Sequence, residues 1–319
     1  MNGTIPKAAL IQGSDGNFYG TTSAGGSDLT ACGGNGCGVV FQLTPGGKIK
    51  ILHDLNGTTD GSDPLGGVLA ASDGSLYGVT AVEATTGDGT LYQLTPQNKN
   101  FIFSVPFTFS RLTSGRYPQL TLLQHTNGVV YGDTGEGGTI TEENGGPFTG
   151  TGTFYSFSEP GMKPFAGLVS TTGKVGDRVG ILGQGFTGTT SVSFGGTPAT
   201  YNVVLDTYLE AVVPAGTTGL VSVVTLSGTL NSNKPYRVTP LVKSFSPSSG
   251  PVGTSVTIKG TGLINTTKVT FGGVLATSFT ANSDTEVTAA VPTGAKTGRI
   301  AITTPGGIAT SATSFTVTP

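Results

Sequence analysis

The side chains that enzymes use most often for chemistry are scarce in this sequence. Its 319 residues include two histidines, two cysteines and no tryptophan, and only 11% of them are charged. Acid–base and nucleophilic catalysis need an activated group beside a positioned base, whereas His53 and His125 both fall in strand-like repeat segments. The sequence therefore predicts a protein that is not an enzyme, with no catalytic residue and no cofactor.

An excess of charge of one sign is also missing. The formal net charge is −2 and arises from scattered residues, so no long-range field attracts nucleic acid or an anionic membrane. Apolar runs of about 18 residues, which a helix needs to span a bilayer, do not occur. The first six residues have neither the basic nor the apolar region of a secretory signal, and we expect either a signal that was removed or a piece of a longer protein.

Helical periodicity is absent, while residues that interrupt helices are abundant. The chain holds 53 glycines and 18 prolines, and one or the other breaks nearly every window with apolar residues at i, i+3, i+4 and i+7. Thr, Val, Phe and Tyr recur instead in runs of about four to seven residues bounded by turn residues, which is typical of strands. The sequence predicts an all-β protein.

The two cysteines, Cys32 and Cys37, are separated by the turn-forming sequence Gly-Gly-Asn-Gly. This spacing favours a small disulfide, which would stabilise the fold by about 2 kcal/mol in the chain-entropy model and would persist outside the reducing cytosol. A pair of free thiols remains the alternative. Two thiols would need two further ligands to hold a metal ion, so no metal site is expected.

The first half of the chain repeats itself around a Tyr-Gly pair. The pairs begin at Tyr19, Tyr77 and Tyr131, which are 58 and 54 residues apart. Each follows a turn pair, which is Asp15-Gly16, Asp73-Gly74 or Asn127-Gly128. Such pairs favour hairpins because both residues can take positive φ, and turn chemistry alone would then account for the acidic residues.

A second hairpin follows in each copy, and its first strand is expected at residues 38–44, 89–96 and 152–157. Two hairpins predict four antiparallel strands per block, as in a propeller blade, with blocks at about 6–60, 61–115 and 116–164. The Tyr-Gly-Thr-Thr step at 19–22 and the Gly-Val-Val-Phe-Gln-Leu-Thr-Pro run at 38–45 resemble the tandem GloVer repeat of bacterial surface proteins that carry interchangeable anchors. The resemblance implies a propeller-like repeat region at 1–164.

Three blades do not close a propeller, which has about four to eight, and an open end would present unpaired strand edges. The chain could continue N-terminally, form a small open assembly, or have its edge covered by a partner. We favour a longer parent protein, because the missing signal points the same way.

The second half of the chain contains another repeat with a period of 77 residues. Val175-Gly176 matches Val252-Gly253, and residues 192–196 match residues 269–273. The run from Phe245 to Gly253, followed by residues 260–263 and 269–273, resembles the IPT/TIG immunoglobulin-like family, which implies β-sandwiches at 165–239 and 240–319. Inward positions of the second should be Val256, Ile258, Val269, Phe271, Val287, Ile300, Ile302, Phe315 and Val317.

Acidic residues in two loops are weak candidates for a site. Asp60 and Asp63 could offer oxygen ligands to Ca²⁺, but they lack the spacing of an EF-hand, and a polar turn between blocks explains them better. Glu142 and Glu143 could pair as glycosidase carboxylates do, but a solvated Gly/Asn-rich loop is the better interpretation.

Two functions of different class remain. The first is a secreted or cell-surface structural or adhesive protein that displays the repeat region on immunoglobulin-like spacers, with a protein or polysaccharide partner and no nucleic acid. The second is an extracellular carbohydrate-binding protein, for which exposed aromatic side chains would line a groove. The candidates for that groove are Tyr19, Tyr77, Tyr131, Phe148 and Tyr155. Because the three repeat tyrosines occupy matching strand positions, packing between blocks explains them better.

Overall fold

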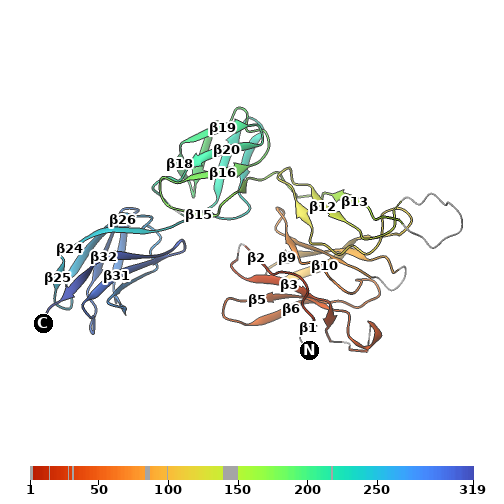
Figure 1. Cartoon of the computed structure of the whole chain (residues 1–319), viewed down its shortest axis with the longest axis horizontal. Helices are drawn as coiled ribbons and strands as arrows, with labels where there is room; N and C mark the ends of the chain where they lie inside the picture. Colours follow the sequence, from red (N-terminus) through yellow and green to blue (C-terminus); the bar gives the residue numbers. More distant parts are fainter. Residues whose placement is uncertain are drawn as a thin grey trace. The chain divides into compact units, whose positions relative to one another are not determined.

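The computed structural model describes residues 3–13, 15–27, 29–30, 32–82, 87–98, 100–138, 150–216 and 218–319. These residues form β-strands and one 3₁₀ turn at Cys32–Gly34, which confirms the all-β prediction. No helix among them is long and apolar enough to cross a membrane. Contacts divide the chain into Met1–Lys163, here the repeat unit, and Pro164–Pro319, here the Ig-like unit (Figure 1).

In the described part of the repeat unit, each block has one antiparallel sheet, besides a separate two-stranded pair near the N-terminus. The sheet of the first block has the order β2-β3-β5-β6 and that of the second the order β7-β8-β9-β10. Their strands are β2 (Ile11–Gln12), β3 (Phe18–Thr22), β5 (Val39–Leu43), β6 (Ile49–Asp54), β7 (Leu69–Ala70), β8 (Leu76–Thr80), β9 (Thr90–Gln97) and β10 (Asn100–Thr108). The third sheet has the order β11-β12-β13, with β11 (Leu123–Gln124), β12 (Val130–Asp133) and β13 (Phe154–Phe157).

The prediction of four strands in every block is therefore wrong for the third block. Its last strand ends at Phe157, and the chain turns at once, with Met162 N donating to Glu159 O at 3.0 Å. Pro160 inside this turn has no N–H to give to a ladder, and Gly161 has a φ of 105°. A hairpin that returns along β13 cannot form from these residues.

The turn pairs also differ from the expected hairpin geometry. Only the glycine of each pair has positive φ, at 82° for Gly16, 85° for Gly74 and 93° for Gly128. Gly16 N donates to Gly13 O at 3.0 Å, and Gly13 N donates to Asn17 O at 2.9 Å. The aspartate thus keeps an ordinary backbone, and its carboxylate can act outside the turn.

Each block begins with a further repeated element that the Tyr-Gly alignment overlooks. Ile5, Asp63 and Tyr117 all have positive φ, between 51° and 56°, and each precedes a proline. The residue before each of them pairs with a residue that follows the Tyr-Gly step. In the first block this pairing joins β1 (Gly3–Thr4) to β4 (Ala24–Gly25), and in the other two blocks it is an isolated β-bridge. The prolines stand 13 residues before each tyrosine, so the signal was present in the sequence.

The cores of the repeat unit lie between neighbouring blocks. Tyr19 and Val40 of the first block are buried against Leu76, Tyr92 and Leu94 of the second. The opposite face of the second sheet supplies the next core, which it shares with the third block. Its buried residues are Ala71, Tyr77, Val79, Leu91, Phe109, Leu122 and Val130. The blocks therefore stack face to face, and a missing neighbour uncovers a sheet face rather than a strand edge.

The first half of the Ig-like unit is a β-sandwich. Its sheets have the orders β14-β16-β20-β19 and β18-β17-β21-β22, with a parallel pair β15-β23. The strands are β14 (Gly167–Leu168), β15 (Thr172–Gly173), β16 (Arg178–Leu182), β17 (Ser191–Phe194), β18 (Thr197–Ala199), β19 (Tyr201–Leu205), β20 (Tyr208–Val212), β21 (Val221–Thr225), β22 (Gly228–Asn231) and β23 (Arg237–Val238). Ile181, Phe194, Leu209 and Tyr236 are among its fully buried core residues.

The second half repeats this strand order as β24-β26-β30-β29 and β25-β32-β31-β27-β28. The strands are β24 (Leu241–Ser246), β25 (Ser249–Gly250), β26 (Ser255–Thr261), β27 (Lys268–Phe271), β28 (Val274–Leu275), β29 (Phe279–Ser283), β30 (Glu286–Ala290), β31 (Gly298–Thr304) and β32 (Gly307–Val317). Of the nine expected inward residues, only Val317 is not fully buried, and it packs partly against the core. Each sandwich holds a core of its own.

Candidate binding surfaces of the repeat unit

The structure joins Cys32 and Cys37 by a disulfide, with their Cα atoms 5.3 Å apart. The bridge packs on the turn that leads from the first block to the second. A Cβ added to Gly57 would lie 2.5 Å from Cys32 Sγ, and the φ of Gly57 is 72°. The disulfide loop thus has a structural role, because it packs against this turn.

In the first block, the carboxylate of Asp15 accepts a hydrogen bond from Tyr19, the tyrosine of the Tyr-Gly step. Tyr19 Oη donates to Asp15 Oδ2 at 2.7 Å, and Gln42 Nε2 donates to Tyr19 Oη at 2.9 Å. Burial, together with the bond to Asp15, raises the pKa of Tyr19 to about 12. Partial burial opposes a charge on Asp15, but hydrogen bonds from Tyr19 and Asn17 outweigh it and lower the pKa of that carboxyl.

The second block repeats this arrangement. Tyr77 Oη donates to Asp73 Oδ2 at 2.8 Å and accepts from Gln93 Nε2 at 2.8 Å. Burial, with the bond to Asp73, raises the pKa of Tyr77. Turn chemistry alone therefore does not account for the acidic residues, because each carboxylate also orients a buried tyrosine. Neither tyrosine is available to a ligand.

The third block lacks both partners of its tyrosine. Asn127 stands in place of the aspartate and Ser156, opposite Tyr131, in place of the glutamine. Tyr131 is half-buried, and its ring stacks on Phe154 with centroids 5.6 Å apart and an interplanar angle of 15°. Phe154 is 76% exposed. The third block thus presents an accessible aromatic pair.

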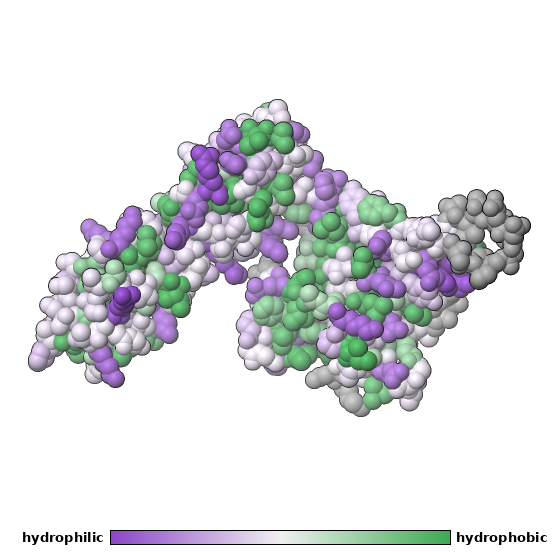
Figure 2. Space-filling view, in the orientation of Figure 1, coloured by the Kyte–Doolittle hydropathy of each residue, from purple (hydrophilic) through white to green (hydrophobic). Residues whose placement is uncertain are grey.

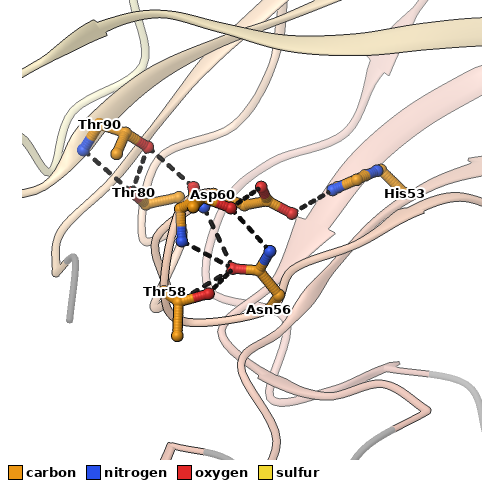
Figure 3. A network of polar contacts seen from close by, with 7 residues as sticks. His53, Asn56, Thr58, Asp60, Thr80 and Thr90 are labelled. Carbon is orange, nitrogen blue, oxygen red and sulfur yellow. Dashed lines mark hydrogen bonds and ion pairs between the residues drawn. The ribbon is translucent and has the colours of Figure 1, made fainter. Parts of the chain in front are cut away.

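Asp60 belongs to a polar network at the junction of the first two blocks (Figure 3). His53 Nε2 lies 2.8 Å from Asp60 Oδ2, and the His53 ring stacks on Phe103 with centroids 3.5 Å apart. Asn56 Oδ1 accepts the backbone N–H groups of Thr58, Thr59 and Asp60. Thr90 Oγ1 of the second block donates to Asp60 O at 2.9 Å. These contacts fix the junction.

The proposed calcium ligands do not come together as a cation site. The carboxylate of Asp60 is paired with His53, while Asp63 is exposed and its backbone bonds to Cys37 and Ala81. Across the part of the chain that the structure describes, no group of three or more His, Cys, Asp or Glu side chains could hold a metal ion.

The remaining predicted residues are dispersed. Tyr155 packs against Phe109 with ring centroids 5.1 Å apart and is half-buried. His125 lies in the turn after β11 rather than in a strand, and its ring meets Tyr131 edge-on. Phe148, Glu142 and Glu143 fall outside the described residues.

Two apolar faces of the repeat unit have no neighbouring block among the residues that the structure describes. The first end face lies on the first block and consists of Leu10, Phe18, Phe41, Leu43, Ile49 and Ile51. The third end face lies on the third block and consists of Leu123, Tyr131 and Phe154. Hydrophobic residues gather at the surface over the first block in Figure 2. Sequence reasoning missed both faces, although aligning the strands of the three copies would have marked them as positions with no neighbour.

Comparisons with known proteins agree with the repeat seen in the sequence. The model of the Gloeobacter/Verrucomicrobia repeat matches residues 5–233, over most of the first sandwich, and the model of the IPT/TIG domain matches residues 240–317. No curated protein matches the chain in sequence.

The chain is also similar in part to solved structures. A surface glycan-binding protein, PbSGBP-B from Prevotella bryantii, is 18% identical over 47% of this chain and 41% of its own, with a TM-score of 0.35. SGBP-B from a xyloglucan utilization locus in Bacteroides uniformis is 21% identical over 47% of this chain and 48% of its own, with a TM-score of 0.25. The chain thus spans less than half of either protein.

The family models confirm both resemblances drawn from the sequence motifs. The repeat model covers more than half of the chain, including all three blocks. The chain therefore belongs to the Gloeobacter/Verrucomicrobia repeat family and carries an IPT/TIG domain after the repeat.

Proposed function

We propose that this chain is a non-enzymatic, secreted or cell-surface adhesive protein. The repeat unit makes the adhesive contact, and the two sandwiches, at 165–239 and 240–319, act as IPT/TIG-type spacers that hold it away from the surface. A protein or a polysaccharide at the cell surface is the partner.

The observation that carries this proposal is that ionisable side chains of the repeat unit are engaged in hydrogen bonds and ion pairs within the fold. Asp15 and Asp73 hold buried tyrosines, and Asp60 pairs with His53 at a junction between blocks. Catalysis needs such groups to converge on a reacting atom in a cleft. Here these three carboxylates instead hydrogen-bond to tyrosine or histidine side chains of the fold. The first and third end faces expose apolar side chains, which favour contacts with a partner.

The proposal is tested by displaying the full chain on a heterologous bacterium through its C-terminus. Cells that carry the chain should adhere to one another or to a polysaccharide-coated surface more than cells that carry the Ig-like unit alone. The purified chain should turn over no glycan or peptide substrate. Absence of adhesion to every surface, or catalytic turnover, would contradict the proposal.

Glycan binding is a second candidate, which the aromatic pair on the third block favours. Sugar rings stack on exposed aromatic faces flanked by polar groups, and Phe154 and Tyr131 lie beside Asp133 at one end of β12 and β13. Calorimetry with soluble plant and microbial polysaccharides would detect this binding, and Phe154→Ala should abolish it. If no polysaccharide binds, or if Phe154→Ala leaves binding intact, this candidate fails.

A further inference from the structure

We propose that two copies of this chain associate head to tail, with the third end face of each covering the first end face of the other. The assembly would be a closed ring of six blocks. This inference goes beyond the adhesive role, because the two faces are complementary whether or not the chain stands on a cell.

The blocks themselves show what covers a surface like the first end face. Leu10 is 45% exposed, whereas its counterparts Val68 and Leu122 in the later blocks are 0% and 4% exposed. Phe18 is half-buried, and its counterparts Leu76 and Val130 are fully buried. The later residues are covered because a preceding block packs on them. The first block has the same kind of face, and no described residue of this chain packs on it as a block.

The third end face shows the converse. Phe154 is 76% exposed, while its counterparts Val40 and Leu91 are 0% and 3% exposed. Leu123 is 69% exposed, although Ile11 and Leu69 at the same position pack against the cores between blocks. These positions are covered wherever another block follows, and no block follows the third.

Both halves of one interface are therefore exposed on a single chain. In the core between the first two blocks, Tyr19 and Val40 of one sheet meet Leu76 and Tyr92 of the next. A second copy offers the corresponding pair, because its Tyr131 and Phe154 can meet Phe18 and Phe41. The proposed contact continues an interface that the chain already makes twice within itself.

The number of blocks in two copies of this chain fits a closed ring. A head-to-tail contact generates a ring when the rotation per subunit closes and an open filament when it does not. Two chains of three blocks give six, and propellers close with about four to eight blades. A dimer would leave neither face exposed.

Asp133 on the third end face opposes the proposed contact, so replacing it should strengthen the dimer. Asp133 lies where the earlier blocks have Thr21 and Val79, which are 2% and 1% exposed. A carboxylate covered without a partner opposes association, because its charge loses water. Asp133→Val should therefore lower the dissociation constant of the dimer.

The experiment measures the mass of the full chain by light scattering coupled to size-exclusion chromatography over a range of concentrations. The wild type should approach twice the mass of the 32.0 kDa chain. Phe154→Asp and Ile49→Asp, on opposite end faces, should each remain at the mass of one chain. Leu226→Asp, on an 83% exposed residue of the Ig-like unit, is the matched control and should dimerise as the wild type does.

Mixing the two defective variants distinguishes this geometry from other dimers. A mixture of Phe154→Asp and Ile49→Asp retains one intact interface, so a dimer should reappear that neither variant forms alone. Unchanged thermal unfolding of each variant's Ig-like and repeat transitions would show that both are folded.

Several results would overturn the inference. They are a wild type that stays monomeric at its solubility limit, growth of the mass beyond two chains, dimerisation of either variant alone, and failure of the mixture to associate. A monomer whose third end face binds polysaccharide would assign that face to a glycan instead. Dimers in solution without adhesion by cells would refute the proposed function and leave this inference standing.

Discussion

The repeat unit and the Ig-like unit bury their apolar residues in different ways. Each sandwich encloses its own core, with Phe194 and Tyr236 in the first and Phe271 and Phe315 in the second. The blocks of the repeat unit share their cores with neighbours, so that three sheets make two cores. A sandwich can therefore be complete by itself, whereas an open stack of blocks has two ends.

This difference indicates where the chain is open to a partner. The sandwiches also expose large apolar residues, such as Leu226 and Val169, and exposed apolar side chains are normal on a protein surface. The two end faces of the repeat unit hold Leu10, Ile49, Leu123 and Phe154, while other exposed apolar residues, such as Leu112 and Leu120, lie elsewhere on that unit. The proposed binding surfaces therefore rest on the packing pattern rather than on a cluster of polar groups.

The largest predicted effect comes from separating the parts. Residues 240–319 alone should unfold cooperatively on heating, because both sheets and the whole core of the second sandwich lie within them. Residues 61–115 alone should show no cooperative transition, because both faces of the second block depend on neighbours. Circular dichroism during heating measures both, and a cooperative transition of the isolated block would break the comparison.

A core substitution in each unit should show whether its core is separate or shared. Phe271→Ala and Tyr92→Ala each remove a fully buried ring and should lower the free energy of unfolding by about 3–5 kcal/mol. Phe271→Ala should affect the second sandwich alone, whereas Tyr92→Ala should destabilise the first and second blocks together. Differential scanning calorimetry of the full chain separates the transitions.

The repeat unit should also be the more sensitive to alkali. An unfolded tyrosine titrates near 10.0, and the pKa of Tyr19 is raised to about 12, so the neutral phenol stabilises the folded state below pH 10. This contribution is lost as the pH rises from about 10 to about 12. Burial raises the pKa of Tyr77, Tyr92 and Tyr155 in the same unit and that of Tyr236 in the Ig-like unit.

Phenolate absorbance followed together with circular dichroism checks this order. The far-ultraviolet signal of the repeat unit should change first as the pH rises, and Tyr77→Phe should reduce its stability at neutral pH because Asp73 and Gln93 lose a partner. Loss of the Ig-like unit at a lower pH than the repeat unit would be inconsistent with the packing described here.

The smallest effect concerns the disulfide. Replacing Cys32 and Cys37 together by serine should lower the free energy of unfolding by about 2 kcal/mol. Because the blocks share cores, this loss should appear in the transition of the whole repeat unit and leave the sandwiches unchanged. Thermal unfolding with and without reductant measures it, and the serine variant should no longer respond to reductant.

Much of the fold could be predicted because strand alternation and turn residues are local signals. The Tyr-Gly steps located three blocks, and the 77-residue period located two sandwiches with Phe271 and Ile302 inside. The missing strand after Phe157 could have been anticipated from Pro160. The backbone of Asp15 was predicted wrongly, because these turns need positive φ only at the glycine in all three blocks.

The surfaces were harder to predict than the fold. The Tyr-Gly step alone does not distinguish Tyr131 from Tyr19 or Tyr77, although Asn127 replaces the aspartate four residues before it. Their exposure differs because two of them have a following block and the third has none. The exposure of these tyrosines depends on the position of the block in the chain, so it can be predicted only by comparing matching positions of the three blocks.

Hydrogen exchange of the full chain, followed by mass spectrometry, tests the central claim most directly. If the cores lie between the blocks, β3, β8 and β12 should lose protection together with one free energy of opening, while β16 and β26 open separately, each with its own sandwich. Independent opening of β3, β8 and β12, each with its own free energy, would show that the blocks are self-sufficient and would contradict the account.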